Sequence, residues 1–151
     1  MNQPLFELNL AELSQVPAAC LCLHVRRASR ILTQRYDLAL RPTGLVLNQF
    51  TLLVAIYLAG PQPVTRLAQQ LATDQTTMTR NLKVLEKQSL VAIAPGEDRR
   101  VRLVRLTESG KAALAQALPL WQQAQAETIQ HFGAQNWQTL LSLLSAVESL
   151  D

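Results

Sequence analysis

Hydrophobic residues recur at three- and four-residue intervals along most of the chain, which is the spacing of amphipathic helices. In the first part of the chain one apolar stripe is formed by Leu21, Val25, Ala28 and Leu32. This pattern predicts one long helix over residues 13–40. Residues 41–44 contain a proline and a glycine, and we expect them to end that helix.

Three shorter helices are predicted in the middle of the chain, over residues 48–59, 64–72 and 75–88. Asp74 is suited to cap the third of them, because its carboxylate can accept hydrogen bonds from the free amides of the first helical turn. Two short helices joined by a tight turn form the helix-turn-helix pattern, here at residues 64–88.

A hairpin is predicted directly after these helices. Residues 91–94 and 101–106 are β-branched or apolar, and a charged tip at residues 95–100 separates them. Thr107 is expected to cap a long helix, and Gly133 to separate it from a last helix over residues 135–150. That last helix has an apolar stripe from Trp137 to Leu150, so it needs an apolar partner. The chain is therefore expected to be mainly α-helical with a small β-hairpin.

The predicted helix over residues 75–88 has one apolar face and one polar face. Met78, Leu82 and Leu85 fall on the apolar side. The opposite side carries hydroxyls, an amide and cations, the groups that read base edges in a major groove and neutralise phosphates. The residues expected to contact DNA there are Gln75, Thr76, Thr79, Arg80 and Lys83. The alternative is an ordinary solvated helix face.

The tip of the hairpin favours the DNA interpretation. Four arginines fall within seven residues, and an arginine at such a tip can enter a minor groove, whose negative potential attracts guanidinium. Arg99 or Arg100 is the expected minor-groove contact. Asp98 lies among these arginines and is expected to form a structural ion pair that holds one of them. A solvated turn with chance charges is the alternative.

Charge is distributed unevenly along the 151 residues. Residues 64–106 carry a net charge of +4, whereas residues 107–151 carry −3. The middle of the chain is therefore suited to a polyanion and the end is not. Hydrophobic residues make up 48% of the chain and charged residues only 17%, which excludes intrinsic disorder and favours an oligomer that covers part of the apolar surface.

The first residues lack the basic start and apolar core of a signal peptide, and two cysteines cannot form a disulfide framework, so we expect a reduced, cytoplasmic setting. Residues 42–65 carry no charge, but prolines and amides interrupt them. The uninterrupted apolar piece, residues 52–59, is far shorter than the roughly 20 residues of a membrane span. A buried helix is the better interpretation, with no membrane partner.

Several segments together resemble the MarR family of bacterial transcriptional regulators. They are Val64-Thr65-Arg66-Leu67-Ala68, Asp74 to Arg80, Leu85-Glu86-Lys87, Asp98-Arg99-Arg100 and Leu106-Thr107-Glu108-Ser109-Gly110. One departure is Ala72-Thr73 at the turn, where glycine is frequent in the family. The resemblance covers nearly the whole chain.

The resemblance implies a winged helix-turn-helix fold with long N- and C-terminal dimerisation helices. Residues 1–44 and 111–151 would form the helical dimerisation region, and residues 45–110 the DNA-binding domain. A homodimer would bind double-stranded DNA at a palindromic operator, with half-sites about one helical turn apart. By resemblance, such proteins act as repressors that a small molecule or oxidation releases.

Cys22 is the candidate redox sensor. It lies one helical turn before Arg26, and an adjacent cation stabilises a thiolate. Cys22 and Tyr36 match a cysteine and a tyrosine of the organic hydroperoxide-sensing branch, whereas Arg26 and Leu47 stand where further tyrosines are expected. The alternative is that both cysteines are inert core residues. On a helix, Cys20 and Cys22 point about 200° apart, so they cannot jointly chelate a metal or form a relaxed disulfide within that helix. A disulfide between subunits after oxidation is the alternative that stays open.

A ligand cleft is the second effector hypothesis. Its expected lining is Tyr36, Leu47, Phe50 and Val54, with Arg30 or Arg26 holding the carboxylate of a small aromatic or lipophilic molecule. These apolar residues are otherwise core.

Enzyme and metal-site patterns are missing from the sequence. The glycines are at least fourteen residues apart, and neither a His-Glu-x-x-His nor a Gly-x-Ser-x-Gly motif occurs. We expect no enzyme activity, cofactor or metal. A winged-helix adaptor that binds protein instead of DNA is the alternative function.

Overall fold

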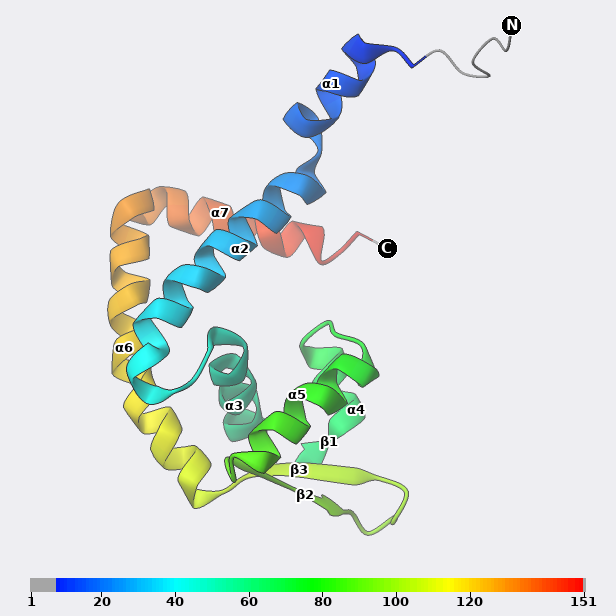
Figure 1. Cartoon of the computed structure of the whole chain (residues 1–151), viewed down its shortest axis with the longest axis vertical. Helices are drawn as coiled ribbons and strands as arrows, with labels where there is room; N and C mark the ends of the chain where they lie inside the picture. The colour runs from blue at the N-terminus through cyan, green and yellow to red at the C-terminus, as the bar shows by residue number, and fades with distance from the viewer. Residues whose placement is uncertain (1–7, 151) are drawn as a thin grey trace, which may run out of the picture. The chain divides into compact units, whose positions relative to one another are not determined.

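The computed structural model describes residues 8–150, in two compact units that meet between Arg35 and Tyr36. Residues 1–7, on which the expectation of a missing signal peptide rests, lie outside the described part, as does Asp151. The ends of the predicted dimerisation region therefore lie outside it too. Figure 1 shows the order of the elements.

The first unit holds α1 (Leu10–Ala19) and most of α2 (Leu21–Leu40). The prediction of one continuous helix over residues 13–40 is wrong, because the chain breaks at Cys20, whose φ of −72° and ψ of 104° are extended. Helical periodicity continues through the break, so the sequence pattern did not reveal it. Asn9 caps α1 by accepting hydrogen bonds from the amides of Ala11 and Glu12.

The second unit is a helical domain with one small sheet. Its helices are the single turn η1 (Arg41–Thr43), α3 (Leu47–Ala59), α4 (Val64–Gln70), α5 (Gln75–Lys87), α6 (Glu108–Phe132) and α7 (Ala134–Val147). The α3 helix lies in the core, with Phe50, Leu53 and Ile56 almost fully buried, as expected for the uncharged segment. Within residues 8–150 no single helix is long and apolar enough to cross a membrane, although α2 with η1 and α3 satisfy the length and composition as a bent pair.

The sheet has three antiparallel strands in the order β1-β3-β2. The expected hairpin is confirmed as β2 (Val91–Pro95) and β3 (Arg102–Leu106), paired from Val91 with Leu106 to Pro95 with Arg102. The two-residue strand β1 (Gln62–Pro63), which pairs with the other edge of β3, was not predicted. In Figure 1 the hairpin extends beyond the neighbouring helices as a wing.

Hydrogen bonds and a close backbone contact join the wing to α6. Thr107 caps α6 as predicted, because its hydroxyl oxygen accepts from the Gly110 amide at 3.0 Å and also donates to the Ser89 carbonyl at 2.6 Å. A Cβ on Gly110 would lie 2.0 Å from the Leu90 carbonyl oxygen, so only glycine fits. This contact fixes where the long helix α6 leaves the sheet.

The architecture confirms the predicted fold class, mainly α with a small hairpin wing. Helices α4 and α5 with the turn between them form the helix-turn-helix, and Ala72 in that turn has a φ of +47°. This left-handed conformation favours glycine, which explains why alanine here is a departure.

Candidate nucleic-acid interface

Helix α5 is held in place by its apolar face and its cap. Met78, Leu82 and Leu85 are at most 1% exposed, as the sequence predicts. Asp74 accepts hydrogen bonds from the Thr77 hydroxyl at 2.6 Å and from the Thr77 amide at 2.8 Å. The hydroxyl bond, and then the amide bond, hold the pKa of Asp74 below its ordinary value of 3.8.

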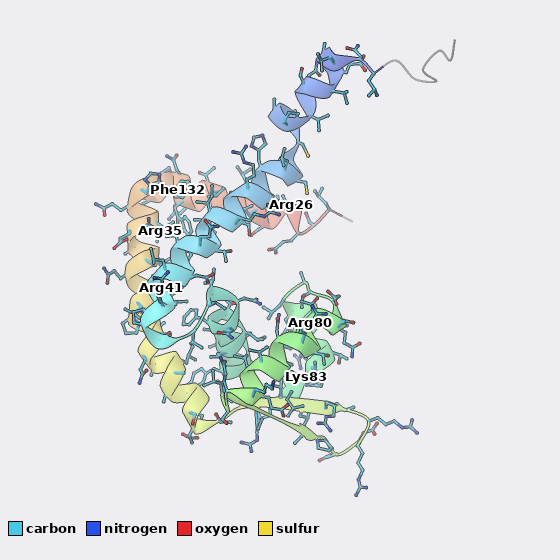
Figure 2. The ribbon with its side chains drawn as sticks, viewed as in Figure 1. Arg26, Arg35, Arg41, Arg80, Lys83 and Phe132 are labelled. Carbon is cyan, nitrogen blue, oxygen red and sulfur yellow. The ribbon has the colours of Figure 1, made fainter. Side chains whose placement is uncertain are left out.

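The polar face of α5 is exposed and forms one continuous surface. An open hollow of about 480 Å³ is lined by Gln75, Thr76, Thr79, Arg80 and Lys83. These are the five residues that the sequence predicts as major-groove contacts. Figure 2 labels two of them, Arg80 and Lys83, on α5.

A deeper depression of about 330 Å³ connects this face with the wing. It is lined by Gln75, Thr79 and Lys83 of α5 and by Arg100 at the end of the wing tip. The structure therefore brings together predicted contacts from two separate parts of the sequence. Arg99 is exposed and lines neither hollow.

Three further polar residues of the depression were not predicted as contacts: Thr65, Glu86 and Arg102. The alternation of side chains along β3 puts Arg102 on the side of the buried Val104, whereas Arg105 faces the other way. That alternation was available in the sequence and would have separated the two arginines. The placement of Thr65 at the start of α4 required the tertiary structure.

The wing tip is held by backbone hydrogen bonds. The Asp98 carboxylate accepts from the Arg100 amide at 2.9 Å, and the Gly96 amide donates to the Val101 carbonyl at 2.8 Å. The predicted ion pair of Asp98 with an arginine is wrong for the described residues, where no such pair is formed. A carboxylate two residues before an amide closes a local turn, which needs no guanidinium.

The electrostatics of this surface favour an anion. Arg80, Lys83, Arg100 and Arg102 lie on or beside the two hollows, against the single carboxylate of Glu86. Within residues 8–150 none of these four cations is held in an ion pair. Their charges are therefore available to phosphates.

The residues expected to line a ligand cleft lie in or against the core. Phe50 is buried and stacks on Trp121 with ring centroids 5.9 Å apart, while Leu47 and Val54 pack partly buried beside it. Tyr36 is buried too, and its hydroxyl donates a hydrogen bond to Gln125. A ligand cleft lined by these residues stays a prediction.

The candidate redox residues of the first unit are more exposed. Cys22 is exposed and Cys20 is half-buried. Arg26 donates to the Cys22 sulfur, with 3.9 Å between Nη2 and Sγ, as the spacing of one helical turn predicts. Arg30 is exposed.

Comparisons with known proteins give one consistent result. The model of the MarR family matches residues 45–101. The transcriptional regulator MosR of M. tuberculosis, solved in complex with DNA, is 39% identical and superposes with a TM-score of 0.76 over 86% of this chain and 97% of that one. An E. coli MarR variant complexed with operator DNA is 25% identical, with a TM-score of 0.81 over 93% of this chain and 99% of that one.

An uncharacterized HTH-type transcriptional regulator of Bacillus subtilis (strain 168), YwoH, is 29% identical over 87 residues. The match spans 58% of this chain and 64% of YwoH. The family model covers the helix-turn-helix and reaches into the wing, and the 39% identity extends over nearly all of a known member. This chain therefore belongs to the MarR family of transcriptional regulators.

Proposed function

We propose that this chain acts as a homodimer that binds a pseudo-palindromic operator and represses transcription there. The observation that carries the proposal is the continuous surface of α5 and the wing, where three of the five polar residues of α5 line the same depression as Arg100. Two related chains were solved in complex with DNA, which supports the same use of this surface.

Each part of the surface has a proposed task on DNA. Arg80 bonds a guanine edge in the major groove, and Thr76 and Thr79 contact base edges or phosphates beside it. Gln75 supplies an amide for an adenine edge, and Lys83 neutralises a phosphate. Arg99 or Arg100 enters the minor groove from the wing.

The dimer is proposed to form through residues 1–44 and 111–151. No residue of α7 is buried, and Leu141, Leu143 and Leu144 are exposed on it. In the first unit Leu10, Val16 and Leu21 are likewise exposed. Exposed apolar helix sides of this kind are what a dimer of this family would cover.

Release from DNA is proposed to follow either a small ligand or thiol oxidation. The ligand would be an aromatic or lipophilic anion at Tyr36, Leu47, Phe50 and Val54, with Arg30 as its carboxylate partner. The oxidation would occur at Cys22, beside Arg26. Exposure of Cys22 supports the second route, whereas burial of Phe50 means that the first needs the core to open.

Fluorescence anisotropy with the upstream intergenic DNA of its own gene, over a series of salt concentrations, tests the DNA-binding proposal. Arg80→Ala should weaken binding by about 1–3 kcal/mol per contact and relax the base preference at one position of each half-site. Arg105→Ala is the matched control, because Arg105 lies outside both hollows. It should leave base preference unchanged.

Two results would overturn this function. If Arg80→Ala loses the same affinity for every DNA sequence, the proposed role of α5 in base recognition is wrong. No salt-dependent binding to any duplex would leave the adaptor function, in which this surface binds protein.

A further inference from the structure

We propose that Asp37 is a positioning residue for operator binding, because its carboxylate joins the last turn of α2 to the first turn of α3. The inference rests on the proposed function, since it concerns how a homodimer holds its two recognition helices at a fixed separation. Asp37 itself does not touch DNA in this proposal. It acts through α3 and the core that α3 shares with α5.

The joint is a hydrogen bond between residues ten positions apart. The Leu47 amide donates to Oδ1 of Asp37 at 2.6 Å. Both residues are half-buried, so water competes less for this bond than it would on an open surface. Hydrogen bonds to a carboxylate are shorter and stronger than bonds between neutral groups. The bond therefore holds the end of one helix against the start of the next.

The local sequence explains why a residue of another helix supplies this acceptor. The N-cap position of α3 is Val46, whose side chain has no acceptor and whose own amide donates to Oε1 of Gln49 at 3.2 Å. The first amides of a helix have no partner within that helix. Leu47 is the first residue of α3, and a negative charge beside a helix N-terminus is favourable. Asp37 thus stabilises α3 from α2.

The same turn of α2 is attached to the second unit at two further points. Residues 36–40 are the part of α2 that belongs to this unit. The Tyr36 hydroxyl donates to Gln125 of α6, and Leu40 is fully buried in the core. Two consecutive residues, Tyr36 and Asp37, therefore bond to two different helices. These attachments restrict rotation of the turn against α3 and α6.

The chain between α2 and α3 is short and is closed by hydrogen bonds of its own. The Thr43 hydroxyl donates to the Leu40 carbonyl at 2.7 Å and accepts from the Leu45 amide at 3.3 Å. Gly44 has a φ of +74°, which lets the chain turn there. Loss of the Asp37 bond would therefore leave the two helices adjacent and would change the angle between them.

The position of α3 affects α5 through the core. Phe50, Leu53 and Ile56 of α3 lie in one buried cluster with Met78 and Leu82 of α5. A close-packed core transmits a displacement because it contains little empty space. The joint also crosses the boundary between the proposed dimerisation region, which includes α2, and the proposed DNA-binding domain. In a homodimer it would therefore set the separation and rotation of the two α5 helices.

Operators with altered spacing test this role. One base pair more or less between two half-sites shifts them by about 3.4 Å and rotates them by about 35°. The probes are the operator, located by footprinting in the upstream intergenic DNA of the gene, and duplexes with one base pair added or removed at its centre. By fluorescence anisotropy, the unmodified protein should bind both altered duplexes at least about tenfold more weakly than the operator.

Asp37→Ala removes the acceptor and should relax this preference. The variant should bind the operator about tenfold more weakly and prefer it to the altered duplexes by less than about threefold, because a looser joint fits several spacings. Asp37→Asn keeps an acceptor oxygen and should retain most of the preference. Glu108→Ala is the control, since it also removes one negative charge but lies outside both hollows. It should leave the preference unchanged.

A second substitution separates positioning from helix stability. Val46→Thr gives α3 a local cap, because Val46 is exposed and has the extended backbone of an N-cap. In the double variant Asp37→Ala/Val46→Thr, the midpoint of urea denaturation should return toward that of the unmodified protein, while the spacing preference stays relaxed. Recovery of the preference together with stability would overturn the proposal, because Asp37 would then only stabilise the helix.

The unmodified protein and the variants test different statements. If Asp37→Ala is folded by urea denaturation and keeps the full spacing preference, the joint does not position α5 and the inference is wrong. If the unmodified protein binds its operator but accepts every spacing, no residue sets the separation and the inference is wrong as well. If the unmodified protein binds no duplex, the proposed function fails, and the inference that rests on it fails with it.

Discussion

At the scale of single residues, Ala72 shows what a local conformation costs. Its φ of +47° places it in the left-handed region. It lies in the turn after α4, which is closed by hydrogen bonds from the Ala72 and Thr73 amides to carbonyls of that helix. The left-handed conformation costs alanine about 1–2 kcal/mol of conformational free energy, whereas it costs glycine little. The departure from the family pattern is therefore tolerated and slightly destabilising.

Ala72→Gly should raise the free energy of unfolding by about 0.5–1 kcal/mol. The substitution removes the strain of the left-handed conformation, but the greater conformational freedom of glycine in the unfolded chain offsets part of that gain. Urea denaturation measures it. Ala113→Gly, inside α6, is the control and should lower stability by about 1 kcal/mol. If Ala72→Gly is no more stable than the unmodified protein, the left-handed turn is wrong.

Asp74 gives a second prediction at this scale. Its folded pKa is lowered by the Thr77 hydrogen bonds, so its stabilising charge is fully present above the ordinary 3.8 and is lost as pH falls through the folded value. Thr77→Val removes the hydroxyl donor and keeps the amide. An NMR titration should then show the Asp74 pKa rising toward 3.8; an unchanged pKa would mean that the hydroxyl bond does not form.

At the scale of elements, the wing and α6 are set by a few backbone contacts. The Leu90 carbonyl leaves no room for a side chain at position 110, and Thr107 ties the same corner to Ser89. The position of Gly110 in the resembling motif is therefore a packing requirement. In the wing, an aspartate holds the turn through a backbone amide.

Gly110→Ala should destabilise the protein by about 3 kcal/mol or more, because the new methyl group would overlap a backbone carbonyl that has little freedom to move. Thermal unfolding checks this. Ser109→Ala, one residue earlier on an exposed side of the helix, should change stability by less than about 0.5 kcal/mol. Equal effects of the two substitutions would contradict the close contact.

Asp98 gives a prediction that separates charge from shape. Because its carboxylate accepts from the Arg100 amide, Asp98→Asn keeps an acceptor and should retain most of the DNA affinity. Asp98→Ala loses the acceptor and should loosen the tip and weaken binding severalfold. Anisotropy compares the two. If Asp98→Asn weakens DNA binding as much as Asp98→Ala, the negative charge is required. The hydrogen bond from the Arg100 amide is then not the main contribution of Asp98 to affinity.

At the scale of the whole molecule, the proposed dimer depends on the exposed apolar side of α7. Leu144→Glu puts a charge in the middle of that side and should shift the dimer to monomer, with operator affinity falling at least tenfold. Analytical ultracentrifugation measures the shift. Ser142→Glu, on the opposite side of α7, should leave the dimer intact. A dimeric Leu144→Glu protein would contradict the proposed use of α7.

The candidate site was predictable to the extent that it is local. The face of α5 follows from helical spacing, and its cap follows from one aspartate before a helix, so all five residues that line the hollow on α5 could be named in advance. Thr65 could not be named in advance, because its place in the same depression as Gln75 depends on how α4 packs. The predicted partner of Asp98 was wrong, because charge suggested a guanidinium, whereas the backbone amide of Arg100 donates to the carboxylate.

By itself, the sequence determined the helices, the hairpin, the caps at Asp74 and Thr107 and the family, because each depends on residues close along the chain. Only the tertiary structure decided the extended conformation of Cys20, which one ψ angle sets while the helical pattern continues. It also decided the pairing of β1 with β3, which joins residues about forty positions apart. Periodicity averages over several turns, so it registers neither a single dihedral nor a long-range pair.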